Sequence, residues 1–159
     1  MTSRNRRHVA TGWTLVAVQA ALIVGIVLVP VGDDWPLPSW AATTATALTW
    51  IGGLLIVWAV LVFGRGVTPS PVPSDRARLR TRGPYRWIRH PMYSGVMVLM
   101  AGSALARRNL PAAALWVVLV GFFVAKARWE ERRLVETYPG YREYRDRTPP
   151  FVPRARREP

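Results

Sequence analysis

The 159-residue sequence contains no cysteine and only two histidines. The absence of cysteine excludes disulfide bonds, thiolate metal ligands and a thiol nucleophile. His8 and His90 alone provide too little material for a typical zinc site. We therefore expect no metal ion and no covalent intermediate on the protein.

Acidic residues are also scarce, with 9 Asp and Glu against 22 Lys and Arg and a formal net charge of +13. Such a balance is compatible with nucleic-acid binding. Charge is absent, however, from four long stretches, which are residues 12–32, 35–64, 91–106 and 109–125. Four apolar runs are untypical of a basic nucleic-acid module, so we expect no nucleic-acid partner.

A transmembrane helix needs roughly 20 mostly apolar residues. The first two runs meet this length, and the last two are shorter but can be extended by arginines whose charged heads reach the interface. We predict an all-α integral membrane protein, a single domain of residues 1–159 with about four transmembrane helices. The predicted spans are residues 13–31, 39–63, 92–106 and 110–126.

Basic residues concentrate before the first span, in the loop of residues 65–91 and toward the C-terminal region of residues 127–159. The connections after the first and third spans hold few or none. By the positive-inside rule, both termini and the long loop are cytoplasmic, where they attract anionic membrane lipids. The Ala-, Arg- and Val-rich composition is typical of a high-GC bacterium, so we expect the bacterial inner membrane.

The segment from Arg82 to Gly95 combines cations, aromatic rings and Gly-Pro breaks between two apolar runs. Pro91 suits the start of a helix, whose free amide donors favour anions. Arg89 adds a permanent charge, and His90 adds a donor or a stacking ring. The alternative is that these are basic residues on lipid phosphates.

Tyr93 and Gly95 fall on the first turn of the third predicted span. Gly95 would allow close approach either of a ligand or of another helix, and the sequence favours neither. Tyr85 would stack on a flat ring or anchor the loop at the membrane interface.

Two further groups lie in the C-terminal region. Glu130 and Glu131 interrupt a basic stretch of helix, where they either pair with Lys126 and Arg128 along the helix or bind an amino group or hydroxyls. Beyond them, tyrosines alternate with arginines, as an aromatic lid over a ligand or as an interfacial helix. This second group consists of Tyr138, Tyr141, Arg142, Tyr144 and Arg145.

Taken in order, these motifs resemble the isoprenylcysteine carboxyl methyltransferase family, within a wider group that includes phospholipid N-methyltransferases. The matching pieces cover about the second half of the chain. They are Gly83 to Gly95, Glu130-Glu131 with Leu134, Tyr138 to Tyr144, and Thr148 to Pro153. In this chain Pro139-Gly140 stands where relatives often have glycine directly after the aromatic residue.

The resemblance implies S-adenosylmethionine as cofactor, in a cytoplasmic site formed by the loop before the third span and the C-terminal helix. It also implies an integral membrane methyltransferase whose lipophilic or small acceptor enters from the bilayer. The implied cofactor-binding residues are Tyr85, Arg89, His90, Pro91, Tyr93, Gly95, Glu130, Glu131 and Tyr141. Arg142 and Arg145 are the candidate catalytic residues, because either could hold an anionic acceptor.

Three alternatives remain open. A sterol-reductase-like enzyme that uses NADPH shares an Arg-His-Pro-x-Tyr pattern, but it is normally much longer. A non-enzymatic scaffold would bind anionic lipid through its basic loops and tolerate loss of His90. Within the family, the acceptor is a carboxylate or another oxygen, sulfur or nitrogen nucleophile, including a small thiol, an amine or a phospholipid.

Overall fold

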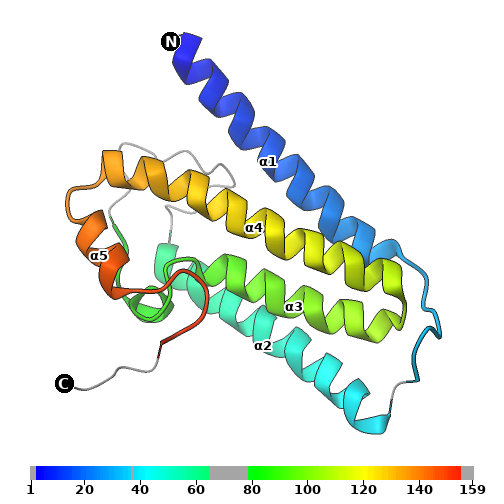
Figure 1. The fold of residues 1–159 in the computed structure, drawn as a ribbon. Helices are drawn as coiled ribbons and strands as arrows, with labels where there is room; N and C mark the ends of the chain where they lie inside the picture. The colour runs from blue at the N-terminus through cyan, green and yellow to red at the C-terminus, as the bar shows by residue number, and fades with distance from the viewer. Residues whose placement is uncertain (1–2, 37, 65–78, 155–159) are drawn as a thin grey trace.

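The computed structural model describes residues 3–36, 38–64 and 79–154, and within them it is built from helices without any strand (Figure 1). This confirms the predicted all-α class. The elements are α1 (Ser3–Leu28), α2 (Ser39–Phe63), the short 3-10 helix η2 (Gly83–Arg86), α3 (Pro91–Arg107), α4 (Leu110–Thr137) and α5 (Tyr141–Arg147). Residues 65–78 of the predicted loop and residues 155–159 of the C-terminal region lie outside the described residues.

The helix ends follow from local sequence. Pro91 opens α3, where its missing N–H and fixed φ are suited to the first turn. Arg108 ends α3 in a left-handed conformation with φ 56°, and the Asn109 side chain then caps α4 by accepting from the backbone N–H of Ala112 at 2.9 Å. Gly140, with φ 85°, lets the chain turn from α4 into α5.

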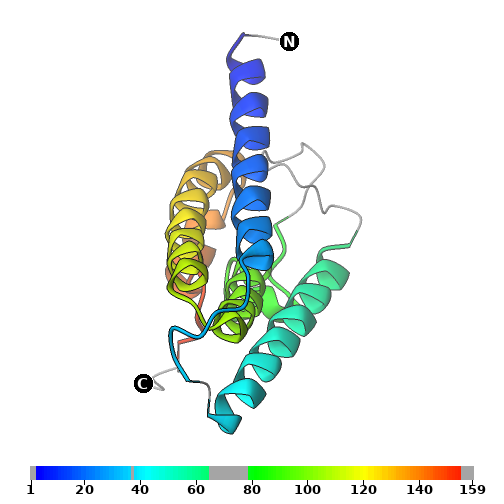
Figure 2. The same ribbon diagram turned by 90° about the vertical axis from the view of Figure 1, so that its right-hand side faces the viewer.

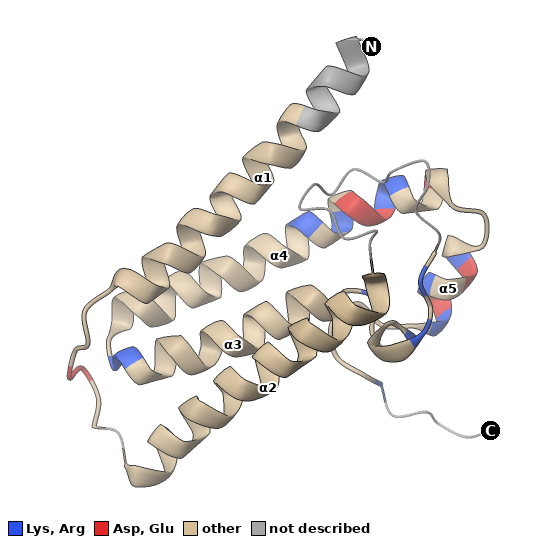
Figure 3. Cartoon of the chain, turned by 180° about the vertical axis from the view of Figure 1, so that it is seen from behind, with Lys and Arg blue, Asp and Glu red and all other residues tan. Residues whose placement is uncertain are grey.

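Three helices contain segments long and apolar enough to cross a membrane, namely Ala10–Leu28, Ser39–Phe63 and Leu110–Thr137. With 17 residues, α3 is shorter than the roughly 20 that a span needs. Among the described residues, charged residues lie mainly toward the two ends of the bundle (Figure 3). Integral membrane character is therefore supported, whereas the count of four spans and the orientation stay predictions.

Glycines bring α2 and α3 into close contact. A Cβ atom on Gly52 would lie 2.5 Å from the carbonyl oxygen of Gly95, and one on Gly102 would lie 2.4 Å from the carbonyl oxygen of Ala45. Small residues of this kind allow helix backbones to approach within a membrane. The outer face of α2 stays exposed and apolar, with Trp40, Trp50 and Leu61 among its residues.

The core lies where α1, α3 and α4 meet. Its fully buried side chains include Ile26 of α1 and Leu119 and Phe123 of α4, with Met100 of α3 beside them. In both ribbon views, the N-terminal part of α1 extends beyond the other helices (Figure 2). α1 is therefore packed against the bundle over its C-terminal portion.

One end of the bundle, which we call the far end, joins α1 to α2 and α3 to α4. Its polar groups bind the main chain. Arg107 Nη1 donates to Val29 O at 2.7 Å, Asn109 Nδ2 donates to Pro30 O at 2.5 Å, and Leu110 N donates to Asp34 Oδ2 at 2.6 Å. These bonds satisfy helix termini and hold the two connections together.

Candidate functional site

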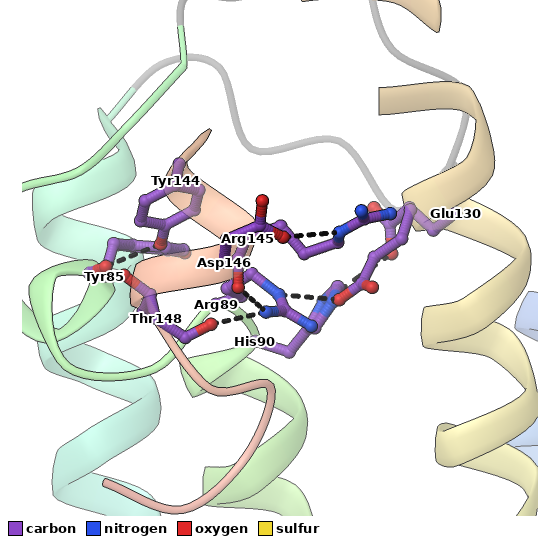
Figure 4. Close-up of polar contacts among 9 residues, drawn as sticks. Tyr85, Arg89, His90, Glu130, Tyr144, Arg145, Asp146 and Thr148 are labelled. Carbon is purple, nitrogen blue, oxygen red and sulfur yellow. Dashed lines mark hydrogen bonds and ion pairs between the residues drawn. The ribbon is translucent and has the colours of Figure 1, made fainter. Parts of the chain in front are cut away.

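The opposite end, which we call the site end, collects side chains from three parts of the chain (Figure 4). They come from the junction of η2 and α3, from the last three turns of α4, and from α5 with the segment that follows it. Residues about 40 positions apart in sequence form its hydrogen bonds, as in the bonds from Arg89 and His90 to Glu131. The predicted site residues are therefore largely brought together.

Arg89 connects the acidic residues to the C-terminal segment. Its Nε donates to Glu131 Oε1 at 2.8 Å, and its Nη1 donates to the carbonyl oxygens of Arg145 (2.6 Å) and Thr148. The side chain is only 9% exposed. A fixed guanidinium suits this role, because its planar set of donors can satisfy several acceptors at once.

His90 and Tyr93 bind the adjacent glutamates. His90 Nε2 lies 2.9 Å from Glu131 Oε1, and the Tyr93 hydroxyl donates to Glu130 Oε2 at 2.8 Å. The His90 and Tyr93 rings stack with their centroids 5.3 Å apart. The glutamates therefore bind residues at the start of α3 rather than the i−3 and i−4 cations of their own helix. Binding of a ligand's amino group or hydroxyls by this pair stays a prediction.

The segment after α5 is fastened across the start of α3 by its main chain. Arg89 N donates to Pro149 O at 2.9 Å, and His90 N donates to Pro150 O at 3.0 Å. The Ser94 hydroxyl donates to Phe151 O at 2.8 Å. The Pro149-Pro150-Phe151 segment therefore closes one side of the site, and it also uses amide donors at the start of α3.

Three buried phenols line this end. The Tyr144 hydroxyl donates to Tyr85 O at 2.5 Å, whereas the hydroxyls of Tyr85 and Tyr141 have no hydrogen-bond partner among the described residues. Burial is the main cause that raises the pKa of Tyr144 to about 12. Burial likewise raises the pKa of Tyr85 and of Tyr141, so all three phenols are neutral at physiological pH.

Among the described residues, neither candidate catalytic arginine forms an ion pair with Glu130 or Glu131. Arg142 is exposed on α5. Arg145 contributes its main-chain oxygen to the Arg89 contact, while its Nε lies 3.5 Å from Asp146 Oδ1. A role for either side chain in holding an acceptor stays a prediction.

The space beside Gly95 is filled by α2, because a Cβ atom on Gly95 would lie 2.6 Å from Ile56 Cγ1 and 2.9 Å from Gly52 O. Pro91 is buried at the first turn of α3. Of the two interpretations of Gly95, the structure shows close helix contact. A direct cofactor contact by Gly95 or by Pro91 stays a prediction.

One polar contact near the site was missed by sequence reasoning. The Lys126 ammonium donates to Gln19 Oε1 of α1 at 2.6 Å and lies 5.0 Å from the centroid of the Tyr93 ring. The available signal was Gln19 itself, a lone amide in the middle of the first apolar run.

The fold and the site together define an all-helical membrane protein with an Arg-His-Pro-x-Tyr loop bound to a helical acid pair. A family model described as phospholipid methyltransferase matches residues 40–140, a range that contains the loop and the acid pair. The chain therefore belongs to the phospholipid methyltransferase family, as the motifs indicated.

Two curated relatives agree with this assignment. The chain is 30% identical over 118 residues to protein-S-isoprenylcysteine O-methyltransferase B of Arabidopsis thaliana, covering 72% of this chain and 60% of that protein. It is 34% identical over 117 residues to the cobalt-zinc-cadmium resistance protein CzcN of Cupriavidus metallidurans, covering 67% and 52%. The matched part thus spans between half and two thirds of each relative.

Proposed function

We propose that this protein is an S-adenosylmethionine-dependent methyltransferase that acts at the membrane. The observation that carries the proposal is the Glu130-Glu131 pair, which is bound by Arg89, His90 and Tyr93 at the end of an apolar helical bundle. Family membership supports the methyltransferase class. The carboxylates and buried phenol hydroxyls at the site end support the choice of S-adenosylmethionine as cofactor.

The residues present suit the chemistry of this cofactor, which carries an amine, a carboxylate, a ribose, an adenine and a sulfonium. Within the described residues, the hydrogen bonds to the acidic pair fall on Glu131 Oε1 and Glu130 Oε2, which leaves one acceptor oxygen on each carboxylate. The hydroxyls of Tyr85 and Tyr141 are buried donors without a described partner. Unpaired buried polar groups are costly, so a polar ligand beside them would be stabilising.

Each group has a distinct role in this proposal. Glu130 and Glu131 would hold the amino group or the ribose hydroxyls, and the phenol rings would contact the flat or cationic parts of the cofactor. Arg89 and His90 would position the carboxylates. When bound, the cofactor supplies a methyl group activated by its sulfonium, and the protein contributes alignment and exclusion of water.

The acceptor is proposed to be lipophilic and to reach the site from the bilayer, with Arg142 or Arg145 facing its polar part. The Arabidopsis relative is named for an isoprenylcysteine acceptor, and an isoprenylcysteine-like carboxylate is the first compound class to test here. A carboxylate nucleophile needs no general base, whereas an amine or a thiol would call for one. The inner membrane, with cytoplasmic termini, is the proposed location.

Calorimetric titration of the detergent-purified protein with S-adenosylmethionine, S-adenosylhomocysteine and NADPH tests the proposal. We expect micromolar binding of the first two compounds. Glu130→Ala should weaken both by at least about tenfold, since it removes a charged hydrogen-bonding partner. Glu143→Ala is the matched control, because Glu143 is exposed and pairs with Arg147 on α5.

Binding of NADPH alone would replace the proposal with a reductase. A folded protein that binds none of the three would favour a lipid-binding scaffold. Normal cofactor binding by both Glu130→Ala and His90→Ala would show that the site is placed wrongly.

A further inference from the structure

Lys126 is a buried cation in an apolar helix. It is 3% exposed, and it belongs to α4, one of the helices apolar enough to cross a membrane. Its hydrogen-bond partner Gln19 lies midway along the apolar segment Ala10–Leu28 of α1. The charge is therefore enclosed between two membrane helices rather than placed in water.

Among the described residues, no carboxylate lies within ion-pair distance of the Lys126 ammonium, and Glu130 attracts it only from further away. The ammonium has three donors, and the described residues offer it the Gln19 oxygen and the faces of Tyr93 and Phe122 at 5.0 and 6.0 Å. In the described part of the chain it forms no ion pair, although Glu130 lies one turn further along the same helix. A buried charge without a counter-charge in direct contact is unfavourable, so an ionisable residue within a membrane helix indicates function.

Tyr93 places this cation next to the site. Its ring contacts Lys126, and its hydroxyl binds Glu130. Tyr93 also packs against Phe123 with ring centroids 4.9 Å apart, which fixes its position against α4. Glu130 and the Lys126 ammonium therefore contact the same aromatic side chain, and the ammonium is also hydrogen-bonded to α1.

We propose that Lys126 binds the anionic head group, a carboxylate or a phosphate, of a lipophilic acceptor. The proposal rests on the methyltransferase function above and names the class of its acceptor. Gln19 holds the ammonium in place until the acceptor arrives, because an amide oxygen satisfies one donor without neutralising the charge. Tyr93 then separates the acceptor head group from the acid pair.

A purely structural role for Lys126 would explain fewer of these contacts. A contact that only tethered α1 to α4 would be served by two apolar side chains, which often stabilise a buried position better than a charged residue does. The remaining donors of the ammonium and its position beside Tyr93 are explained by an anion that binds there.

The test measures binding in phosphatidylcholine nanodiscs, where the surrounding lipid carries no net charge. The probes are N-acetyl-S-farnesylcysteine, its neutral carboxamide and farnesyl phosphate. We expect the wild-type protein to bind at least one of the two anions about tenfold or more tightly than the carboxamide, as for one charge-assisted hydrogen bond. The preferred anion identifies the head group.

Lys126→Met should abolish this preference and leave the affinity for the carboxamide nearly unchanged. Lys126→Gln, which retains a donor for Gln19, should give the same result and provides a second neutral variant should the methionine protein fail to fold. Arg132→Met removes the same charge from an exposed position on the same helix and should leave the preference intact. The ratio of the two affinities is the readout, because a general loss of structure would lower both.

Equal affinities for the anions and the carboxamide in the wild-type protein would overturn the proposal, and so would a preference that survives both neutral variants. Titration with S-adenosylmethionine in the same nanodiscs separates the two proposals. Cofactor binding without an anion preference removes the role of Lys126 alone. A preference that depends on Lys126 without cofactor binding removes the methyltransferase function and retains the anion site.

Discussion

The two ends of the bundle use similar residues for different purposes. At the far end, Arg107, Asn109 and Asp34 bind main-chain groups and complete two connections. At the site end, Arg89 binds both a carboxylate and main-chain oxygens. The difference teaches that polar residues at a helix end do more than complete connections when their side chains bind one another and leave buried hydroxyls without described partners.

The two ends also differ in whether their buried polar groups have hydrogen-bond partners. The side chain of Asn109 is both donor and acceptor in its contacts, so nothing at that position calls for a ligand. The site end keeps the hydroxyls of Tyr85 and Tyr141 without described partners. Buried hydroxyls without described partners therefore distinguish the site end, whereas the Asn109 side chain at the far end uses both its amide nitrogen and its amide oxygen.

The largest effect should come from Arg89→Met. The substitution leaves Glu131 without its cation and frees the two carbonyl oxygens that Arg89 binds, and breaking a buried ion pair of this kind costs about 3–5 kcal/mol. Denaturant unfolding in detergent would measure the loss, and limited proteolysis should show earlier cleavage after α5.

Arg108→Met is the far-end control for this experiment. Arg108 Nε reaches Trp35 O at 3.4 Å, a long hydrogen bond. We expect its loss to cost less than about 1 kcal/mol. Equal effects of the two substitutions would contradict the distinction between the ends.

Alkaline pH should loosen the site end first. A phenol whose pKa is higher in the folded state than in the unfolded state favours folding below the unfolded value of 10.0, and this contribution is lost as the pH rises to the folded pKa of about 12 for Tyr144. Each such phenol gives a slope of about 1.4 kcal/mol per pH unit in that window. Hydrogen exchange between pH 10 and pH 12 should accelerate in α5 before the α3–α4 turn.

Tyr144→Phe tests the origin of that slope. The variant loses the hydrogen bond to Tyr85 O, for about 1 kcal/mol at neutral pH, and its stability should then depend less steeply on alkaline pH. An unchanged slope would assign the alkaline effect to other groups.

The smallest effect on the site end should follow Asn109→Ala at the far end, although the substitution removes two far-end hydrogen bonds. Loss of the α4 cap costs about 1 kcal/mol. Because the substitution lies at the opposite end from the acid pair, the affinity for S-adenosylmethionine should stay unchanged in calorimetric titration. Weakened cofactor binding would show that the two ends are coupled.

Much of the candidate site could be predicted from the sequence, because its motifs combine residue types that packing alone does not explain. Arg89, His90 and Glu131 were predicted as site residues, and the structure brings them together. The partners of the two glutamates could not be chosen in advance. The sequence left open neighbouring cations on the helix and the amino group or hydroxyls of a ligand. The partners that the structure shows lie instead at the start of α3, about 40 positions away in sequence.

Gly95 and Lys126 both show that local sequence does not specify which residue of another helix makes contact. A glycine allows close approach without specifying what approaches, so the sequence left a ligand and a helix equally open, and only the position of α2 shows the helix. Pairing of Lys126 with Glu130 along α4 was one of two interpretations that the sequence left open. The contact of Lys126 with Gln19 depends on how α1 lies against α4, and no local pattern encodes that.

The sequence by itself determined the helical class, the apolar segments and the location of the chemical motifs. It could do so because hydrophobic runs, helix-ending residues and charge distribution act over a few turns of chain. Tertiary structure decided which acid meets which base, which phenols are left without partners, and which cation lies between two membrane helices. Those choices depend on contacts between residues about 40 to more than 100 positions apart, and packing fixes them only once the helices are assembled.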